Sequence, residues 1–175
     1  MKIRRASPAD ADALLAIYRP IVENTTISFE LVPPTEQAFA DRIAATLSRH
    51  EWLVGEVRGV ICGYAYATPH RPREAYQHAV ETSVYVHPEH YGNGFGKQLY
   101  QALFPALDAL GFHNAYAGIA LPNPASIALH QAVGFEPVGV FREIGYKQDA
   151  WHDVSWWQRS VASIVREAPA MTIDP

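Results

Sequence analysis

The sequence predicts an α/β (α+β) domain in which helices flank a mixed sheet. The apolar runs Trp52–Val57 and Val60–Ala67 are joined tightly at Arg58-Gly59, which indicates an antiparallel hairpin. Between Val80 and Leu103 a strand pattern, a glycine-rich turn and a helix pattern follow one another, which indicates a strand–helix–strand unit. Hairpins combined with such units are typical of a mixed sheet covered by helices.

Composition indicates one globular domain over residues 1–165, followed by a flexible tail over residues 166–175. Of the 175 residues, 49% are hydrophobic and 18% are charged, which is enough apolar material for a core. The net charge of −4 argues against a nucleic-acid-binding surface. Cys62 is the single cysteine, so no internal disulfide can form. With no leader and no long apolar run, we expect a cytoplasmic protein that does not enter a membrane.

The first third of the chain predicts a strand and two helices. Lys2–Ala6 is a short strand, and Ser7-Pro8 supplies the cap and first turn of a helix that Pro20 should disrupt. Thr25–Glu30 is too polar for a core strand, so we expect a loop or short helical turn near the ligand. Thr35 caps the second helix.

The last third predicts a strand over Ala115–Ile119 and a helix over Ser126–Val133 that ends at Gly134. Two further strands should follow over Phe135–Val140 and Tyr146–Gln158, with a turn near Lys147–Asp149.

The central stretch carries the features that suggest a ligand. Its strand alternates from Val80 to Val86 and ends at His87-Pro88, because the residue before proline avoids helical angles. Gly92, Gly94 and Gly96 then allow close approach of a ligand to the backbone. A helix that begins in such a turn presents free N–H groups and a positive dipole end, which together suit a pyrophosphate.

Five motifs together resemble the GNAT acyltransferase superfamily, and within it the phosphinothricin and methionine sulfoximine/sulfone N-acetyltransferase group. The resemblance covers residues 3–160 and includes the segments Glu81–Val86, Gly92–Lys97, Leu121–Ser126, His130–Phe135 and Trp151–Gln158. It implies a mostly antiparallel central sheet in which two strands splay apart. The superfamily turn usually begins with Gln or Arg, where this chain has Tyr91, so a side-chain contact is lost while the backbone cradle stays.

The resemblance also implies acetyl-CoA as co-substrate and a homodimer, to which the aromatic segment Trp151–Trp157 could contribute surface. The backbone of Val84, Tyr85 and Val86 would bind the pantetheine arm, and Asn123 and Ser126 would touch the far part of coenzyme A. The pyrophosphate cradle would consist of Gly92, Asn93, Gly94, Phe95, Gly96 and Lys97.

Acetyl transfer to an amine needs a base, because an α-amine of pKa about 8 is only about one-tenth neutral at pH 7. Glu81 is the leading candidate, since burial in an apolar strand would favour its neutral form and make it a stronger base. His130 is the second, because related enzymes carry Glu and His at these positions; the alternatives are a structural Glu81 and a core histidine. Attack should be direct, with the oxyanion held by backbone N–H near Val84 or Tyr85 and with Cys62 in the core.

The substrate expected from these residues is a small amine with an anionic end. Arg71 and Arg73 could clamp a carboxylate, and Tyr76, Phe29 and Thr26 would line the apolar part. Two alternatives stay open: acetylation of protein N-termini or of another amine such as an antibiotic, and a non-catalytic acyl-CoA sensor. We expect no metal, because Pro88 disfavours the spacing that would aim His87 and His90 at one ion.

Overall fold

The computed structural model describes residues 1–162, so the predicted tail over residues 166–175 lies outside the described part. The strands are β1 (Lys2–Arg5), β2 (Trp52–Val57), β3 (Val60–Pro69), β4 (Ala79–Val86), β5 (Asn114–Ala120), β6 (Glu136–Lys147) and β7 (Ala150–Ser160). The helices are α1 (Ala11–Asn24), α2 (Glu36–Leu47), α3 (Phe95–Ala109) and α4 (Pro124–Ala132), with short 3-10 turns at Pro8–Asp10, Glu74–Tyr76 and Pro88–His90.

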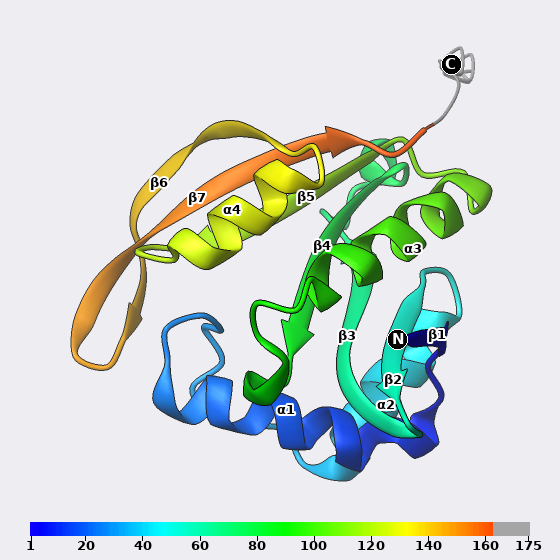
Figure 1. The fold of residues 1–175 in the computed structure, drawn as a ribbon. Coiled ribbons are helices and arrows are strands. Elements are labelled where there is room, and N and C mark those ends of the chain that lie inside the picture. Colours follow the sequence, from blue (N-terminus) through cyan, green and yellow to red (C-terminus); the bar gives the residue numbers. More distant parts are fainter. Residues whose placement is uncertain (163–175) are drawn as a thin grey trace.

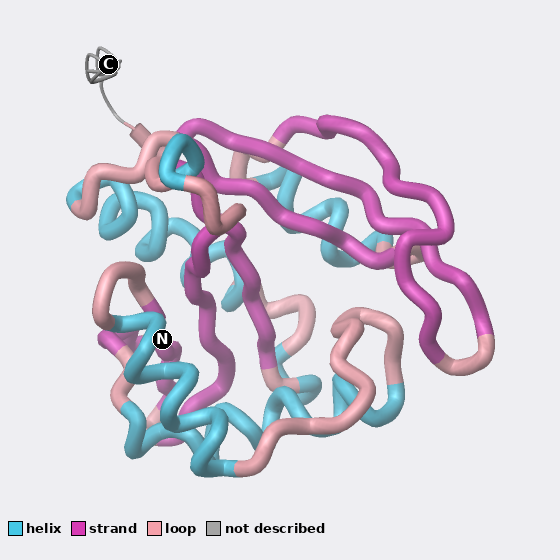
Figure 2. The backbone as a smooth tube through the Cα atoms, turned by 180° about the vertical axis from the view of Figure 1, so that it is seen from behind, coloured by secondary structure: helices cyan, strands magenta, loops and turns pink. Residues whose placement is uncertain are grey.

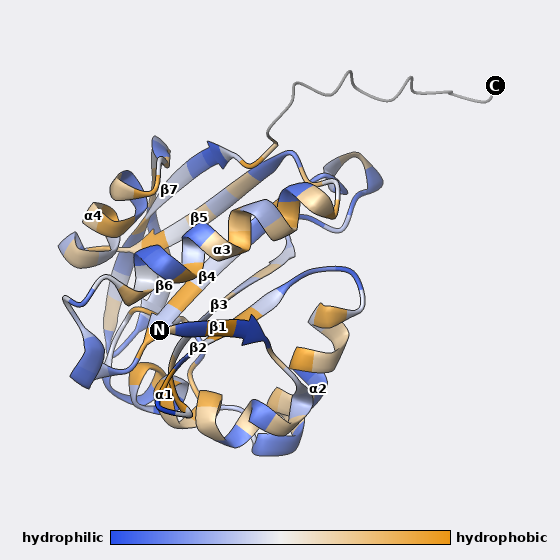
Figure 3. Cartoon of the chain, turned by 45° about the vertical axis from the view of Figure 1, so that its right-hand side comes forward, coloured by the Kyte–Doolittle hydropathy of each residue, from blue (hydrophilic) through white to orange (hydrophobic). Residues whose placement is uncertain are grey.

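The seven strands form one sheet in the order β1-β2-β3-β4-β5-β7-β6 (Figure 1). Only the β4–β5 pair is parallel, so the predicted mixed, mostly antiparallel sheet is confirmed. Around α1, α2 and α3, hydrophobic stretches alternate with hydrophilic ones, as Figure 3 shows. The apolar sides of these helices bury the two faces of the sheet.

Each sheet face has its own core. Leu99, Leu103 and Leu107 of α3 are fully buried against Ala65, Val80 and neighbouring small residues. On the other face α1 and α2 pack on aromatic side chains of the sheet, where Phe39 of α2 meets Trp52, which stacks on Tyr64. Because successive residues of a strand point to opposite faces, each residue of β4 belongs to one side or the other.

Local signals located most elements correctly. The Thr35 hydroxyl accepts from the N–H of Ala38 at 3.2 Å and caps α2, and Arg58-Gly59 makes the β2–β3 turn with positive φ at both residues. The prediction that Pro20 disrupts α1 is wrong. Proline removes one backbone donor, yet Ile21 and Val22 beyond it are buried, so packing on the sheet carries the helix to Asn24.

The prediction for the last strands is also wrong in its bounds. β6 does not stop at Val140 but runs to Lys147, so Tyr146 belongs to β6 and not to the final strand. The pairing of β6 with β7 shifts register after Pro137 and again after Phe141, and most of β6 is exposed. Alternation of apolar and polar residues is therefore absent from this part of the sequence.

Candidate active site

The sheet opens between β4 and β5. These strands pair only from Ala79–Asn114 to Glu81–Tyr116 and then diverge, although β4 continues to Val86 and β5 to Ala120. The opening holds a cavity of about 50 Å³ lined by residues 82–85 of β4, residues 118–120 of β5, and side chains that include Tyr100, Asn123, Ser126 and His130. The two strands thus splay apart. Beyond the last pair, backbone N–H and C=O groups that would otherwise bond between β4 and β5 line the opening.

His130 lies in this opening with both ring nitrogens engaged. It is 4% exposed, and its Nδ1 donates to the carbonyl oxygen of Ser126 at 2.7 Å. A carbonyl only accepts, so the neutral ring has its proton on Nδ1, and Nε2 accepts from the Tyr100 hydroxyl at 2.9 Å. Burial lowers the pKa of His130 and raises that of Tyr100. His130 is a buried, neutral and partnered imidazole beside the splay.

The glycine turn has the predicted open backbone. Gly92 and Gly94 adopt φ of 76° and 73°, and a Cβ at either would meet no atom within 4 Å. Gly94 is the N-cap of α3, whose first helical bond runs from the Gln98 N–H to the Gly94 carbonyl. The N–H groups of residues 95–97 therefore precede the helical ladder, which leaves them free for an anion. Gly96 differs, because it is buried within α3 against Leu129.

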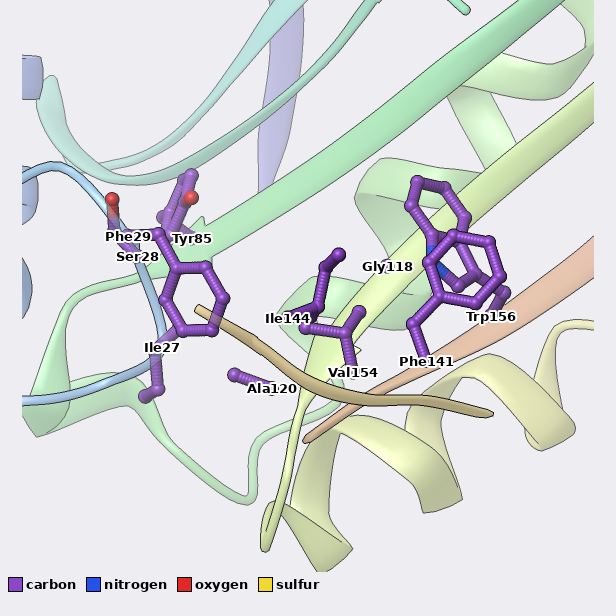
Figure 4. A pocket seen from close by; sticks show the side chains of 10 residues that line it. All are labelled: Ile27, Ser28, Phe29, Tyr85, Gly118, Ala120, Phe141, Ile144, Val154 and Trp156. Carbon is purple, nitrogen blue, oxygen red and sulfur yellow. The ribbon is translucent and has the colours of Figure 1, made fainter. Parts of the chain in front are cut away.

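A larger cavity, of about 300 Å³, lies on the face of the sheet that carries Tyr85 and Gly118. Figure 4 shows Ile27, Ser28 and Phe29 on one side of it and Phe141 and Trp156 on the other, with Ile144 and Val154 between them. The walls are mainly apolar, and Tyr85 borders both cavities. A molecule in this cavity could therefore reach the splay from the side opposite α3 and α4.

The loop over Ile27–Phe29 is fixed by the β6–β7 hairpin, and Figures 1 and 2 both show the two side by side. The Lys147 ammonium is buried and donates to the carbonyl oxygens of Val22 and Ser28, each at 2.7 Å. The Phe29 ring lies so close to Gly145 that a Cβ there would collide with it. The cavity is thus formed by segments that are distant in sequence and tied together at Lys147 and Gly145.

Glu81 is not buried as predicted, since its side chain is 36% exposed. It points to the same face as Ser83 and Tyr85, because alternate residues of a strand share a face. Its Oε1 accepts from Nδ1 of His70 at 3.0 Å. The expected increase in basicity through burial therefore loses its basis, while the position beside the splay holds.

The structure separates some residues that the sequence grouped. Glu81 lies on the α1–α2 face, whereas α4 supplies His130 from the opposite face. Phe29 lines the 300 Å³ cavity, whereas Thr26, Arg71, Arg73 and Tyr76 are absent from its lining. The two arginines are exposed on the loop that connects β3 with β4. Tyr76 lies 5.8 Å, between ring centroids, from His70, so this loop borders Glu81 rather than the cavity floor.

Other predictions concern Cys62 and metals. Cys62 is buried, 1% exposed, as expected for a core residue. Within residues 1–162 no three His, Cys, Asp or Glu side chains gather as metal ligands would. His87 accepts from the Glu89 N–H through Nδ1, and His90 stacks on Phe95. No helix of the described chain is long and apolar enough to cross a bilayer.

Sequence reasoning missed several residues of the site. Their types give no signal on their own, because they are ordinary core or loop residues until the chain folds: Ile27, His70, Tyr100, Phe141, Ile144, Lys147, Val154 and Trp156. Ser28, treated as part of a polar loop, is 7% exposed and hydrogen-bonds Tyr18 at 2.7 Å.

Comparison with known proteins identifies the family. Residues 3–156 match the acetyltransferase (GNAT) domain. The chain is 42% identical over 159 residues to the phosphinothricin N-acetyltransferase of Streptomyces viridochromogenes, which covers 91% of this chain and 87% of that protein. It is 36% identical over 173 residues to the L-methionine sulfoximine/L-methionine sulfone acetyltransferase of Pseudomonas aeruginosa, with 95% and 98% covered.

Solved structures agree with this. The acetyl-CoA complex of a GNAT phosphinothricin acetyltransferase from Sinorhizobium meliloti superimposes with a TM-score of 0.90 at 36% identity, and covers 99% of this chain and 95% of that one. The seven-stranded fold described above is therefore shared with a known acetyltransferase. The chain belongs to the GNAT acetyltransferase family.

Proposed function

We propose that this protein transfers the acetyl group of acetyl-CoA to the primary amine of a small amino-acid analogue of the phosphinothricin, methionine sulfoximine or methionine sulfone type. The observation that carries the proposal is a pair of cavities that share Ile27, Tyr85, Gly118 and Ala120, one in the splay and one on the α1–α2 face of the sheet. Two substrates can then meet through the gap between β4 and β5. The relatives that match more than 90% of this chain are named for the same kind of reaction.

Acetyl-CoA fits the coenzyme side. The pyrophosphate would lie on the free N–H groups of the turn from Gly92 to Lys97, where Gly94 leaves open space. The pantetheine arm would pair with the backbone of Val84–Val86 in the splay. Asn123, whose side chain caps α4 by accepting from the Ser126 N–H at 3.1 Å, lines the same opening. These assignments place the thioester at the junction of the two cavities.

The reaction is direct. Glu81 takes a proton from the substrate ammonium, directly or through water, and the neutral nitrogen attacks the thioester carbonyl. The C–N bond forms, and backbone N–H near Val84 or Tyr85 holds the oxyanion until the C–S bond breaks. The attacking nitrogen then loses its second proton and the departing thiolate takes one up, on the side of Tyr100 and His130, which line the splay. His130, neutral and hydrogen-bonded to Tyr100, serves this second proton transfer rather than the first.

The size of the acceptor cavity, the 300 Å³ cavity described above, favours a small substrate. This volume accommodates an amino acid with a short side chain, and the loop tied down by Lys147 forms one of its walls. A protein N-terminus would need a groove open at both ends. An antibiotic acceptor would need more volume. A non-catalytic sensor would need no acceptor cavity at all, so the enzyme is the better reading.

A homodimer in the cytoplasm completes the proposal. Several large apolar side chains of the β6–β7 hairpin are exposed, among them Val138, Ile144 and Tyr146, with Trp151 at 61%. An apolar surface of this kind suits contact with a second copy. Nucleic acid and membrane play no part in the proposed reaction.

The test is thiol release from acetyl-CoA across a panel of amines, with the acetylated product identified by mass. The panel includes phosphinothricin, methionine sulfone, methionine sulfoximine and ordinary amino acids, and each is paired with its decarboxylated amine. A carboxylate held by Arg71 or Arg73 predicts a KM about ten- to a hundredfold lower for the acid of each pair. Equal rates for acid and amine would remove the carboxylate contact, and turnover only with peptides would replace the proposed substrate class.

A further inference from the structure

A second histidine lies at the acceptor side of the site. His70 directly follows β3, two residues after Thr68, which is the direct cross-strand partner of Glu81. Its Nδ1 is 3.0 Å from Oε1 of Glu81. An ionised carboxylate only accepts hydrogen bonds, so Nδ1 has the proton and donates. The orientation of the Glu81 carboxylate is therefore set by this imidazole.

The His70 ring is itself held in place by three aromatic side chains. It stacks on Tyr116 with ring centroids 4.7 Å apart and planes at 20°. The edges of Tyr76 and Trp156 approach it at 5.8 Å and 6.1 Å. The His70 side chain is only 15% exposed as a result. A flexible surface ion pair would lack this support and would contribute little.

We propose that His70 is a positioning residue for the general base, acting through Glu81. This inference rests on the proposed function, since it assumes that Glu81 takes the ammonium proton. The Nδ1–H bond to Oε1 fixes one carboxylate oxygen and leaves Oε2 free to accept the substrate proton. Because Trp156 also lines the acceptor cavity, the aromatic support of His70 connects the base to the wall that the substrate touches.

The arrangement makes a specific demand on geometry. A proton transfer is fast only when donor and acceptor lie within hydrogen-bond reach, and a displacement of about 1 Å can cost about a hundredfold. Glu81 is exposed on one side and has several rotamers available, so a fixed partner is needed to hold it. His70 is the partner that the described structure provides.

The experiment is a double-mutant cycle with His70→Ala and Glu81→Gln, measured by thiol release with the best amine of the panel. His70→Ala should lower kcat about 10- to 100-fold, with acetyl-CoA affinity by calorimetry unchanged. His70→Asn should recover most of the loss, because the Asn amide N–H occupies the place of Nδ1–H. In the Glu81→Gln background, His70→Ala should change kcat less than about twofold.

His78→Ala is the matched control, because His78 is an exposed histidine near the start of β4 whose Nδ1 binds the backbone oxygen of Gly111. It should keep the wild-type kcat. An equal loss from His70→Ala in both backgrounds, or an Asn variant no better than Ala, would overturn the proposal while wild-type turnover stands. Wild-type protein that releases no thiol with any amine would instead overturn the proposed function, and the positioning role with it.

Discussion

The ammonium group of Lys147, at the end of β6, donates to the carbonyl oxygen of Ser28, 119 positions away in the chain, at 2.7 Å. A second bond of the same length reaches Val22 at the end of α1. Burial lowers the pKa of Lys147, while Glu30 opposes that shift. The bonds from the buried Lys147 ammonium to these two backbone carbonyls therefore fix the position of the loop Ile27–Phe29.

Lys147→Met should destabilise the fold and loosen this loop. Two buried carbonyls lose their donor, and each unsatisfied group costs about 1–3 kcal/mol of the free energy of unfolding. The KM for the amine should rise more than that for acetyl-CoA, because Ile27, Ser28 and Phe29 all line the acceptor cavity, whereas only Ile27 also lines the cavity in the splay. Urea unfolding and steady-state kinetics measure both effects. Lys2→Met, at an exposed position of β1, should change neither, and unaltered kinetics in Lys147→Met would refute the link.

Gly145→Ala tests the contact with Phe29. The new methyl group would occupy the position of the ring, so Phe29 must move and the acceptor cavity must change shape. We expect kcat/KM for the amine to fall at least about tenfold with acetyl-CoA affinity unchanged. Phe29→Ala in the same chain should relieve the clash, so that the double variant loses less than the product of the two single losses. Additive losses would show that the two residues act separately.

Gly94→Val tests the pyrophosphate cradle. A β-branched residue disfavours the left-handed φ of 73° at this position, and its side chain would enter the open space above the turn. Acetyl-CoA affinity by calorimetry should fall at least about tenfold. Gly139→Ala, where a Cβ also meets nothing and φ is not positive, is the control and should bind normally. Wild-type affinity in Gly94→Val would place the pyrophosphate elsewhere.

Glu81→Gln keeps the shape of the side chain and removes its basicity. The kcat should fall about 10²–10⁴-fold with little change in acetyl-CoA binding, since the variant loses only the proton acceptor. His130→Ala should cost the same or less. If both residues act in one proton path, the double variant should lose less than the product. A folded Glu81→Gln enzyme with the wild-type kcat at pH 7 would exclude Glu81 as the base.

The stability of the protein should depend on His130 at mildly acidic pH. Burial lowers the pKa of His130, so the native state keeps it neutral while the unfolded chain takes up a proton below about pH 6.5. The unfolded state then binds more protons, and the free energy of unfolding falls as pH falls through that window. One such group contributes at most about 1.4 kcal/mol per pH unit. His130→Asn should show a correspondingly shallower pH dependence between pH 6.5 and 5, and parallel curves would contradict this.

Local chemistry made part of this structure predictable. Thr35 as a cap and Arg58-Gly59 as a turn act through neighbours within four residues, and the structure has both. The strand β4 alternates because one face meets α3 and the other meets aromatic residues. Pro20 was misleading because burial beyond it outweighs one lost hydrogen bond. The sequence predicts too short a strand for β6, because an exposed, bulged strand shows no alternation of apolar and polar residues.

The candidate site was predictable only in part. The glycines of the turn from Gly92 to Gly96 and the glutamate of the preceding strand form recognisable motifs in the sequence. A coenzyme-binding turn and Glu81 as the base could therefore be predicted from these motifs. The acceptor cavity combines residues 27–29 with residues 141–156, and pairing of segments so far apart has no trace in one sequence. His70 could not be assigned either, because its role depends on a ring stack with Tyr116 that forms only across the sheet.

The splay between β4 and β5 has a consequence for how the substrate specificity of this enzyme can evolve. In the proposed binding mode the coenzyme lies against β4, α3 and α4, whereas the 300 Å³ cavity is lined mainly by the α1–α2 loop and the β6–β7 hairpin, together with Tyr85, Gly118 and Ala120. Substitutions at Ile144 or Phe141 can therefore alter which amine is accepted without altering the elements that hold the thioester. New acceptors can be selected one wall residue at a time, while the acetyl donor stays the same.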